Sequence, residues 1–136
     1  TGAGFKYIKI FFFYILEPKM SGDTGDATLD SVHVDTLLKM RRKLGDKPVT
    51  TVHIFERNDF FYLFEKDGEL AAQHVYGSVT ATKTMGKTEP VSFCVMNHVN
   101  FETTLRFLLL VKHLRVEIFK FIAPKVIQNF FLNYSS

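Results

Sequence analysis

Two adjacent phenylalanines, Phe60 and Phe61, follow a short polar segment, Arg57-Asn58-Asp59, that separates two apolar runs of strand-forming residues. Asparagine is the non-glycine residue best able to adopt positive φ, so Asn58 predicts a tight turn and a β-hairpin. Successive strand residues point to opposite faces, so at least one of Phe60 and Phe61 is expected to be exposed near the tip. An exposed ring there can stack on a nucleic-acid base.

Basic side chains lie in and after this hairpin, where each can contact a phosphate: Arg57, Lys66, Lys83 and Lys87. Phosphate contacts add salt-dependent affinity without choosing a sequence. Scattered lysines are more often plain solvated surface. A denser run contains Lys39, Arg41, Arg42 and Lys43. It predicts either the solvated face of a helix or a contact with a DNA backbone.

Enzyme chemistry finds little support in the residue pattern. The histidines show no paired ligand spacing with cysteine or acid, so a metal site is not expected: His33, His53, His74, His98 and His113. Glu65 and Asp67 are close together in the sequence, as a catalytic carboxylate pair could be, but they suit a loop residue and a helix cap. The chain also lacks the Gly-x-x-x-x-Gly-Lys-Ser/Thr loop of many ATPases.

Size and composition fit one domain. The chain has 136 residues, of which 46% are apolar, and a formal charge of +3 with a pI near 9.0. This charge permits nucleic-acid binding without indicating it. Cys94 lies between Phe93 and Val95, which favours a packed core thiol over a nucleophile. A lone thiol suits a reducing compartment such as cytosol or nucleus.

The elements that position the hairpin follow from apolar spacing. This spacing predicts helices at residues 33–44, 67–76 and 101–113. It predicts strands on both sides of the hairpin turn, the first of which begins at Val49, and further strands at residues 79–83, 91–95 and 115–119. Asp67 and Asn100 are expected as helix caps, Gly77 as a helix end and residues 85–87 as a turn. The last helix is apolar nearly all round at Leu108-Leu109-Leu110-Val111, so it is expected to be buried. Strands interleaved with helices predict a mixed α/β sheet flanked by helices.

The amino-terminal segment is apolar at residues 8–16, a run too short for the roughly 20 residues that cross a bilayer. A signal-peptide core is an alternative, but Glu17-Pro18-Lys19 stands where small residues are expected. Residues 21–30 are small and polar and predict a flexible linker.

Residues 57–64 resemble the Arg-x-Gly-Asp-Phe-Tyr segment in the amino-terminal domain of the MutS mismatch-repair proteins, with Asn58 at the glycine position. The similarity continues, in order, through residues 67–72, 97–102, 108–112 and 114–120. Together these segments are most similar to eukaryotic MutS homologue two over residues 31–120. The resemblance implies the mixed sheet of that domain.

Three parts of the chain follow from this resemblance. Residues 1–30 are expected to be an unrelated apolar segment and linker, residues 31–120 the DNA-binding domain, and residues 121–136 a divergent tail. Met20 is expected to be the natural start, with residues 1–19 from upstream sequence. Without further family strands after Lys120, the sheet is expected to be incomplete and to leave an exposed edge.

In the MutS family a Phe-x-Glu motif senses the mismatch, the phenylalanine by wedging into the base stack and the glutamate by hydrogen-bonding a base. The resemblance places Phe60 at that phenylalanine and Tyr62 at the glutamate, which implies a supporting subunit rather than the one that reads the mismatch. Without the resemblance, Phe60, Tyr62 and Phe64 also suit one core-facing strand face.

The resemblance implies a non-catalytic nuclear domain that binds double-stranded or mismatched DNA through Phe60, Phe61, Tyr62 and nearby basic residues. It also implies a second MutS homologue as heterodimer partner, and no membrane contact. ATP and magnesium are expected only in the ATPase domain of the intact family, which this chain lacks. The alternative is a protein-interaction module that uses its exposed aromatics and its apolar helix.

Overall fold

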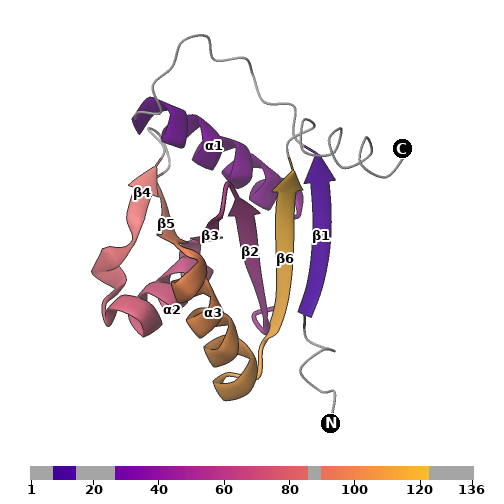
Figure 1. Cartoon of the computed structure of the whole chain (residues 1–136), viewed down its shortest axis with the longest axis vertical. Helices are drawn as coiled ribbons and strands as arrows, with labels where there is room; N and C mark the ends of the chain where they lie inside the picture. Colours follow the sequence, from indigo (N-terminus) through magenta and orange to yellow (C-terminus); the bar gives the residue numbers. More distant parts are fainter. Residues whose placement is uncertain (1–7, 15–26, 86–89, 123–136) are drawn as a thin grey trace, which may run out of the picture.

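A computed structural model describes residues 8–14, 27–85 and 90–122, with only the backbone for Tyr14, residues 27–34 and Met85. Its centre is a mixed sheet of six strands in the order β1-β6-β2-β3-β5-β4 (Figure 1). The strands are β1(Ile8–Tyr14), β2(Thr51–Arg57), β3(Phe60–Phe64), β4(Lys83–Met85), β5(Val91–Met96) and β6(Arg115–Ile122). Strands β1, β6 and β2 are parallel, whereas β2, β3, β5 and β4 are antiparallel neighbours. The predicted mixed sheet is confirmed.

Helices cover both faces of the sheet, which creates two apolar layers (Figure 1). On one face, Leu37 and Leu38 of α1(Ala27–Lys43) pack on Phe55 and Phe119. On the other face, α2(Glu65–Tyr76) and α3(His98–Arg106) bury Ala72 and other apolar residues against the alternate side chains of the same strands. The π-helical turn η3(Phe107–Val111) continues α3.

The hairpin turn forms as predicted. Arg57 is paired with Phe60 across the turn, and the two residues between them, Asn58 and Asp59, have φ of 52° and 66°. Positive φ at both central positions is the geometry whose twist matches that of the flanking strands. Gly77 ends α2 as predicted, with φ of 71° and its N–H donating to the Gln73 carbonyl.

The amino-terminal segment is where the structure differs most from expectation. Strand β1 pairs in parallel with β6, and Phe11 stacks on Phe119 with ring centroids 5.0 Å apart. Strand β6 therefore lies between β1 and β2, and β1 and β4 are the edges of the described sheet. Helix α1 begins at Ala27, inside the predicted linker. The expected domain boundary at residue 30 thus falls within a helix.

Several element ends also differ. The first hairpin strand begins at Thr51, and Val49 is exposed in the preceding turn. The strand predicted at residues 79–83 is instead the short helix η2(Val79–Ala81) followed by β4. Asn97, not Asn100, caps α3, because its side-chain oxygen accepts from the Asn100 N–H at 2.9 Å. The first two residues of the tail predicted at 121–136 belong to β6. The rest of that tail, and most of the turn predicted at residues 85–87, lie outside the described residues.

Candidate nucleic-acid interface

Phe60 is the exposed aromatic of the hairpin tip. Phe60 is 48% exposed, whereas Phe61 is 2% exposed. The Phe61 ring stacks on the Phe101 ring, with centroids 3.8 Å apart and planes 4° apart. The predicted split of the two phenylalanines between opposite faces is confirmed. The backbone beneath Phe60 is fixed by pairing with Arg57 across a two-residue turn. Because this backbone is already ordered, only the side-chain torsions of Phe60 have to be ordered when its ring stacks on a base.

Tyr62 follows Phe60 on the same sheet face but lies in the interior. It packs beside Phe93, with ring centroids 6.5 Å apart, in the layer covered by α1. Phe64 is buried in the same layer, so the expected core face of β3 holds for Tyr62 and Phe64 but not for Phe60. A tyrosine that is only 9% exposed has little surface to offer a base. The position matched to the family's glutamate therefore contributes to packing.

The basic residues proposed for DNA contact do not converge on Phe60. Arg57 is beside it but buried. Lys66 and Lys83 are exposed, yet both lie toward the far end of β3, since Lys66 follows Phe64 and Lys83 is paired with Phe93, the partner of Phe64. Four strand residues span about 13 Å. Lys87 lies outside the described residues. Contact of any of these residues with DNA stays a prediction.

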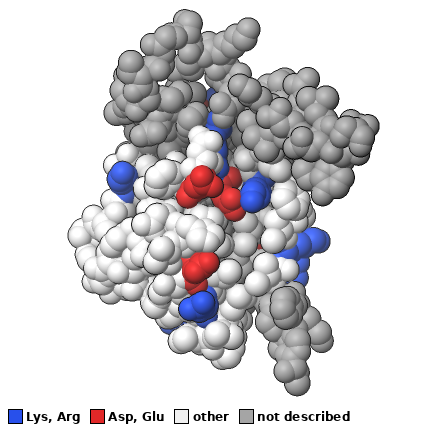
Figure 2. All heavy atoms as spheres, in the orientation of Figure 1, with Lys and Arg blue, Asp and Glu red and all other residues white. Residues whose placement is uncertain are grey.

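Two basic residues of α1 make contacts within the helix or at its end. Lys39 forms an exposed ion pair with Asp35 at 3.1 Å, and the Arg41 guanidinium donates to the Gly45 carbonyl at 2.8 Å, closing the helix end. Figure 2 shows one face of the molecule, where basic side chains are scattered among acidic and uncharged ones. The described residues of that face form no continuous basic patch of the kind that steers DNA.

Asp67 has a role that the sequence did not reveal. Helix α2 begins at Glu65, before Asp67, and its N-terminus has no side-chain cap, so the predicted cap is wrong. Instead, the buried Asp67 carboxylate accepts from the His53 backbone N–H at 3.1 Å and from Lys47 Nζ at 3.1 Å. This carboxylate satisfies a buried strand N–H and ties α2 to β2. The base of the hairpin is thereby anchored.

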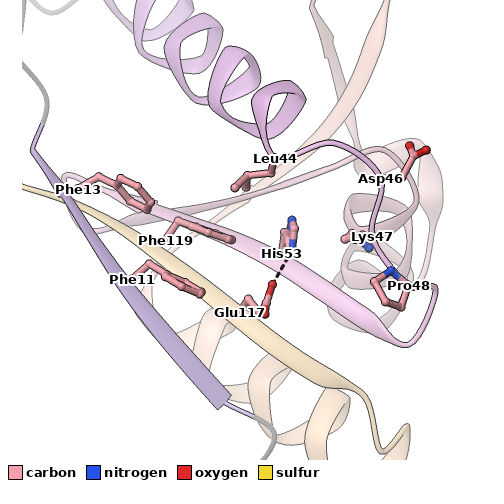
Figure 3. A pocket seen from close by; sticks show the side chains of 9 residues that line it. All are labelled: Phe11, Phe13, Leu44, Asp46, Lys47, Pro48, His53, Glu117 and Phe119. Atoms are coloured by element: carbon pink, nitrogen blue, oxygen red, sulfur yellow. Dashed lines mark hydrogen bonds and ion pairs between the residues drawn. The ribbon is translucent and has the colours of Figure 1, made fainter.

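His53 and Glu117 form a second, partly buried polar contact across β2 and β6. The His53 Nε2 and Glu117 Oε1 atoms are 2.9 Å apart, and Glu117 Oε2 also accepts from Arg115 Nε at 3.3 Å. Both residues line a pocket of about 290 Å³ whose walls include Phe11 and Phe119 (Figure 3). Burial lowers the pKa of His53, against the opposing effect of its bond to Glu117. The neutral imidazole is therefore favoured.

Metal and thiol chemistry gain no support in the described part of the chain. Residues 8–14, 27–85 and 90–122 contain no group of three or more histidine, cysteine or acidic side chains placed to hold a metal ion. Cys94 is buried, and burial raises the pKa of its thiol, which disfavours the nucleophilic thiolate. None of the helices described is long and apolar enough to cross a membrane.

Comparison with known proteins places this fold in a family. Residues 36–130 match the family model of MutS domain I, which is more than half of the chain. DNA mismatch repair protein spellchecker 1 of Drosophila melanogaster is 40% identical over 86 residues, covering 60% of this chain and 9% of that protein. The chain thus spans less than a tenth of that relative. The family match also continues past Lys120, where the sequence resemblance ended. The chain belongs to the MutS family, of which it carries domain I.

Proposed function

We propose that this chain is a non-catalytic, duplex DNA-binding domain for mismatch repair that supports DNA binding without reading the mismatch. The observation that carries the proposal is the exposed Phe60 ring on the short hairpin turn. Exposing this ring brings no folding benefit, whereas stacking on a base is worth about 1–3 kcal/mol. The similarity to a DNA mismatch repair protein supports this assignment.

The supporting role is proposed from Tyr62. A base-reading glutamate must present a carboxylate beside the wedge, but Tyr62 is buried against Phe93. We place the chain with MutS homologue two for this reason, in the nucleus, beside a second MutS homologue that reads the mismatch. ATP and magnesium belong, in this proposal, to a domain outside this chain.

The test is fluorescence anisotropy of the full chain with labelled duplexes, either fully paired or containing one mispair. We expect weak binding that falls steeply with added salt, because phosphate contacts release counterions. The paired and mispaired duplexes should bind almost equally. Tight and mismatch-selective binding would overturn the supporting role, and salt-insensitive binding would argue against phosphate contacts.

Phe60→Ala should weaken duplex binding by roughly fivefold or more, the loss of about 1 kcal/mol of stacking. Tyr76→Ala is the matched control, because Tyr76 is also an aromatic residue with 48% exposure but lies at the end of α2. If the two substitutions weaken duplex binding equally, Phe60 makes no specific contribution to DNA binding.

A further inference from the structure

The π-helical extension η3 of helix α3 exposes two apolar residues, Leu110 and Val111, beside Phe107, which is partly buried against the core. The buried stripe of this helix consists of Phe101, Thr104 and Leu108. Leu110 and Val111 point away from the stripe and are 66% and 63% exposed. A solitary exposed apolar residue is ordinary, but adjacent ones beside a hollow indicate a contact surface.

The hollow beside these residues has walls from two helices. It has a volume of about 290 Å³ and is lined by His74, Thr103, Arg106, Phe107, Leu110 and Val111. The His74 imidazole stacks on the Phe107 ring, with centroids 3.8 Å apart and planes 7° apart. Lys112 Nζ lies 5.7 Å from the centroid of the same ring. Phe107 is therefore held between α2 and the end of η3, so one wall is preformed.

The two charged side chains that we assign to this surface, Arg106 and Lys112, are both cations. Neither Arg106 nor Lys112 forms an ion pair with any residue that the structure describes, and the lining of the hollow contains no carboxylate. The nearby acid on the same helix, Glu102, is engaged with His98 at 3.0 Å. In Figure 2 the region over α3, at the lower end of the view, is mostly uncharged with isolated charged side chains.

We propose that this surface, consisting of His74, Arg106, Phe107, Leu110, Val111 and Lys112, docks an amphipathic segment of a partner protein that has apolar side chains flanked by carboxylates. The apolar side chains would enter the hollow against Leu110 and Val111, and the carboxylates would pair with Arg106 and Lys112. A nucleic-acid backbone would meet the two cations but would leave Leu110 and Val111 without apolar contact. A protein segment satisfies both features.

This surface is separate from the proposed DNA contact. By strand alternation Phe60 shares the sheet face of Tyr62, which α1 covers, whereas α3 packs on the opposite face. Binding at one face therefore leaves the other accessible. The docking proposal does not depend on DNA binding by Phe60.

The test uses the full chain, labelled with ¹⁵N, and two synthetic helical peptides of about 15 residues. Both peptides carry leucines along one face; one has glutamates flanking that face and the other has lysines there. The glutamate peptide should shift the amide signals of residues 106–112 and His74. The lysine peptide should bind roughly tenfold more weakly or not at all.

Substitutions then separate the apolar and charged contributions. Leu110→Ser with Val111→Ser should weaken binding of the glutamate peptide roughly tenfold. Arg106→Glu with Lys112→Glu should reverse the preference, so that the lysine peptide binds better. Val99→Ser is the control, because Val99 is an exposed apolar residue near the start of the same helix. It should leave binding unchanged.

Four results would overturn the proposal. One is that neither peptide shifts these signals. Another is that both peptides bind equally. A third is that Val99→Ser weakens binding as much as the Leu110 and Val111 changes do. The last is that a short DNA duplex shifts the same signals while the glutamate peptide does not, which would assign the surface to nucleic acid.

Discussion

Phe61 and Phe101 stack face to face, with ring centroids 3.8 Å apart, and this contact joins the hairpin to α3. The adjacent Phe60 makes no comparable contribution to the core, since it is half exposed. Two consecutive residues of one type thus have different roles: Phe61 stabilises the domain, and Phe60 offers a ring to the solvent.

Phe61→Ala is therefore expected to lower the free energy of unfolding by about 3–5 kcal/mol, because it removes a buried ring and leaves a cavity. Phe60→Ala should change it by no more than about 0.5 kcal/mol. Urea denaturation followed by circular dichroism measures both values. Similar losses for the two variants would contradict the division of roles, and Phe61→Leu should recover part of the lost stability.

The hairpin was predictable because its signals are local. The turn was predicted from the tolerance of Asn58 for positive φ, which is a property of that residue alone. The opposite orientation of Phe60 and Phe61 follows from the alternation of side chains along one strand. Which of the two is buried depends on Phe101, some forty residues later in the chain. Alternation alone therefore could not decide it.

Asp67 and β1 show why other predictions failed. Asp67 precedes apolar helical spacing, as a cap does, but the N–H that it accepts from belongs to His53. That acceptor role depends on how α2 packs beside β2.

Likewise, an apolar strand at residues 8–14 gives no sign of pairing in parallel with β6, which is more than a hundred residues away. Long-range pairing leaves no spacing pattern in either segment.

Leu108 and Leu110 provide a second stability contrast within one apolar run. Leu108 is fully buried, so Leu108→Asp should place an unpaired charge in the core and unfold the domain, a cost of roughly several kcal/mol. Leu110→Asp should leave the melting temperature nearly unchanged, because Leu110 is mostly exposed. Thermal melting of both variants decides the matter. A Leu108→Asp variant that melts cooperatively near the wild-type temperature would contradict the packing of η3.

Gly68 should be intolerant of alanine even though it lies in a helix, where alanine is normally preferred by about 1 kcal/mol. A Cβ at this position would lie 2.6 Å from the Leu63 carbonyl oxygen and 3.1 Å from the Cys94 backbone nitrogen. Backbone atoms of two strands cannot move aside cheaply. We expect Gly68→Ala to destabilise the domain by about 1–3 kcal/mol in urea denaturation. Gln73→Ala, an exposed change in the same helix, should be neutral or slightly stabilising.

His53 should make stability depend on pH in the range where histidines titrate. Burial lowers its pKa in the folded state below the ordinary value of 6.5, so the unfolded chain binds the proton more readily. Stability therefore rises with pH through this range and is lost as pH falls below about 6.5, at no more than about 1.4 kcal/mol per pH unit. The free energy of unfolding at pH 7.5 and 5.5 measures this loss. His53→Gln, which retains a hydrogen-bond donor toward Glu117 but cannot titrate, should lose less stability over the same interval. Equal losses in the variant and the wild type would show that another group controls the pH dependence.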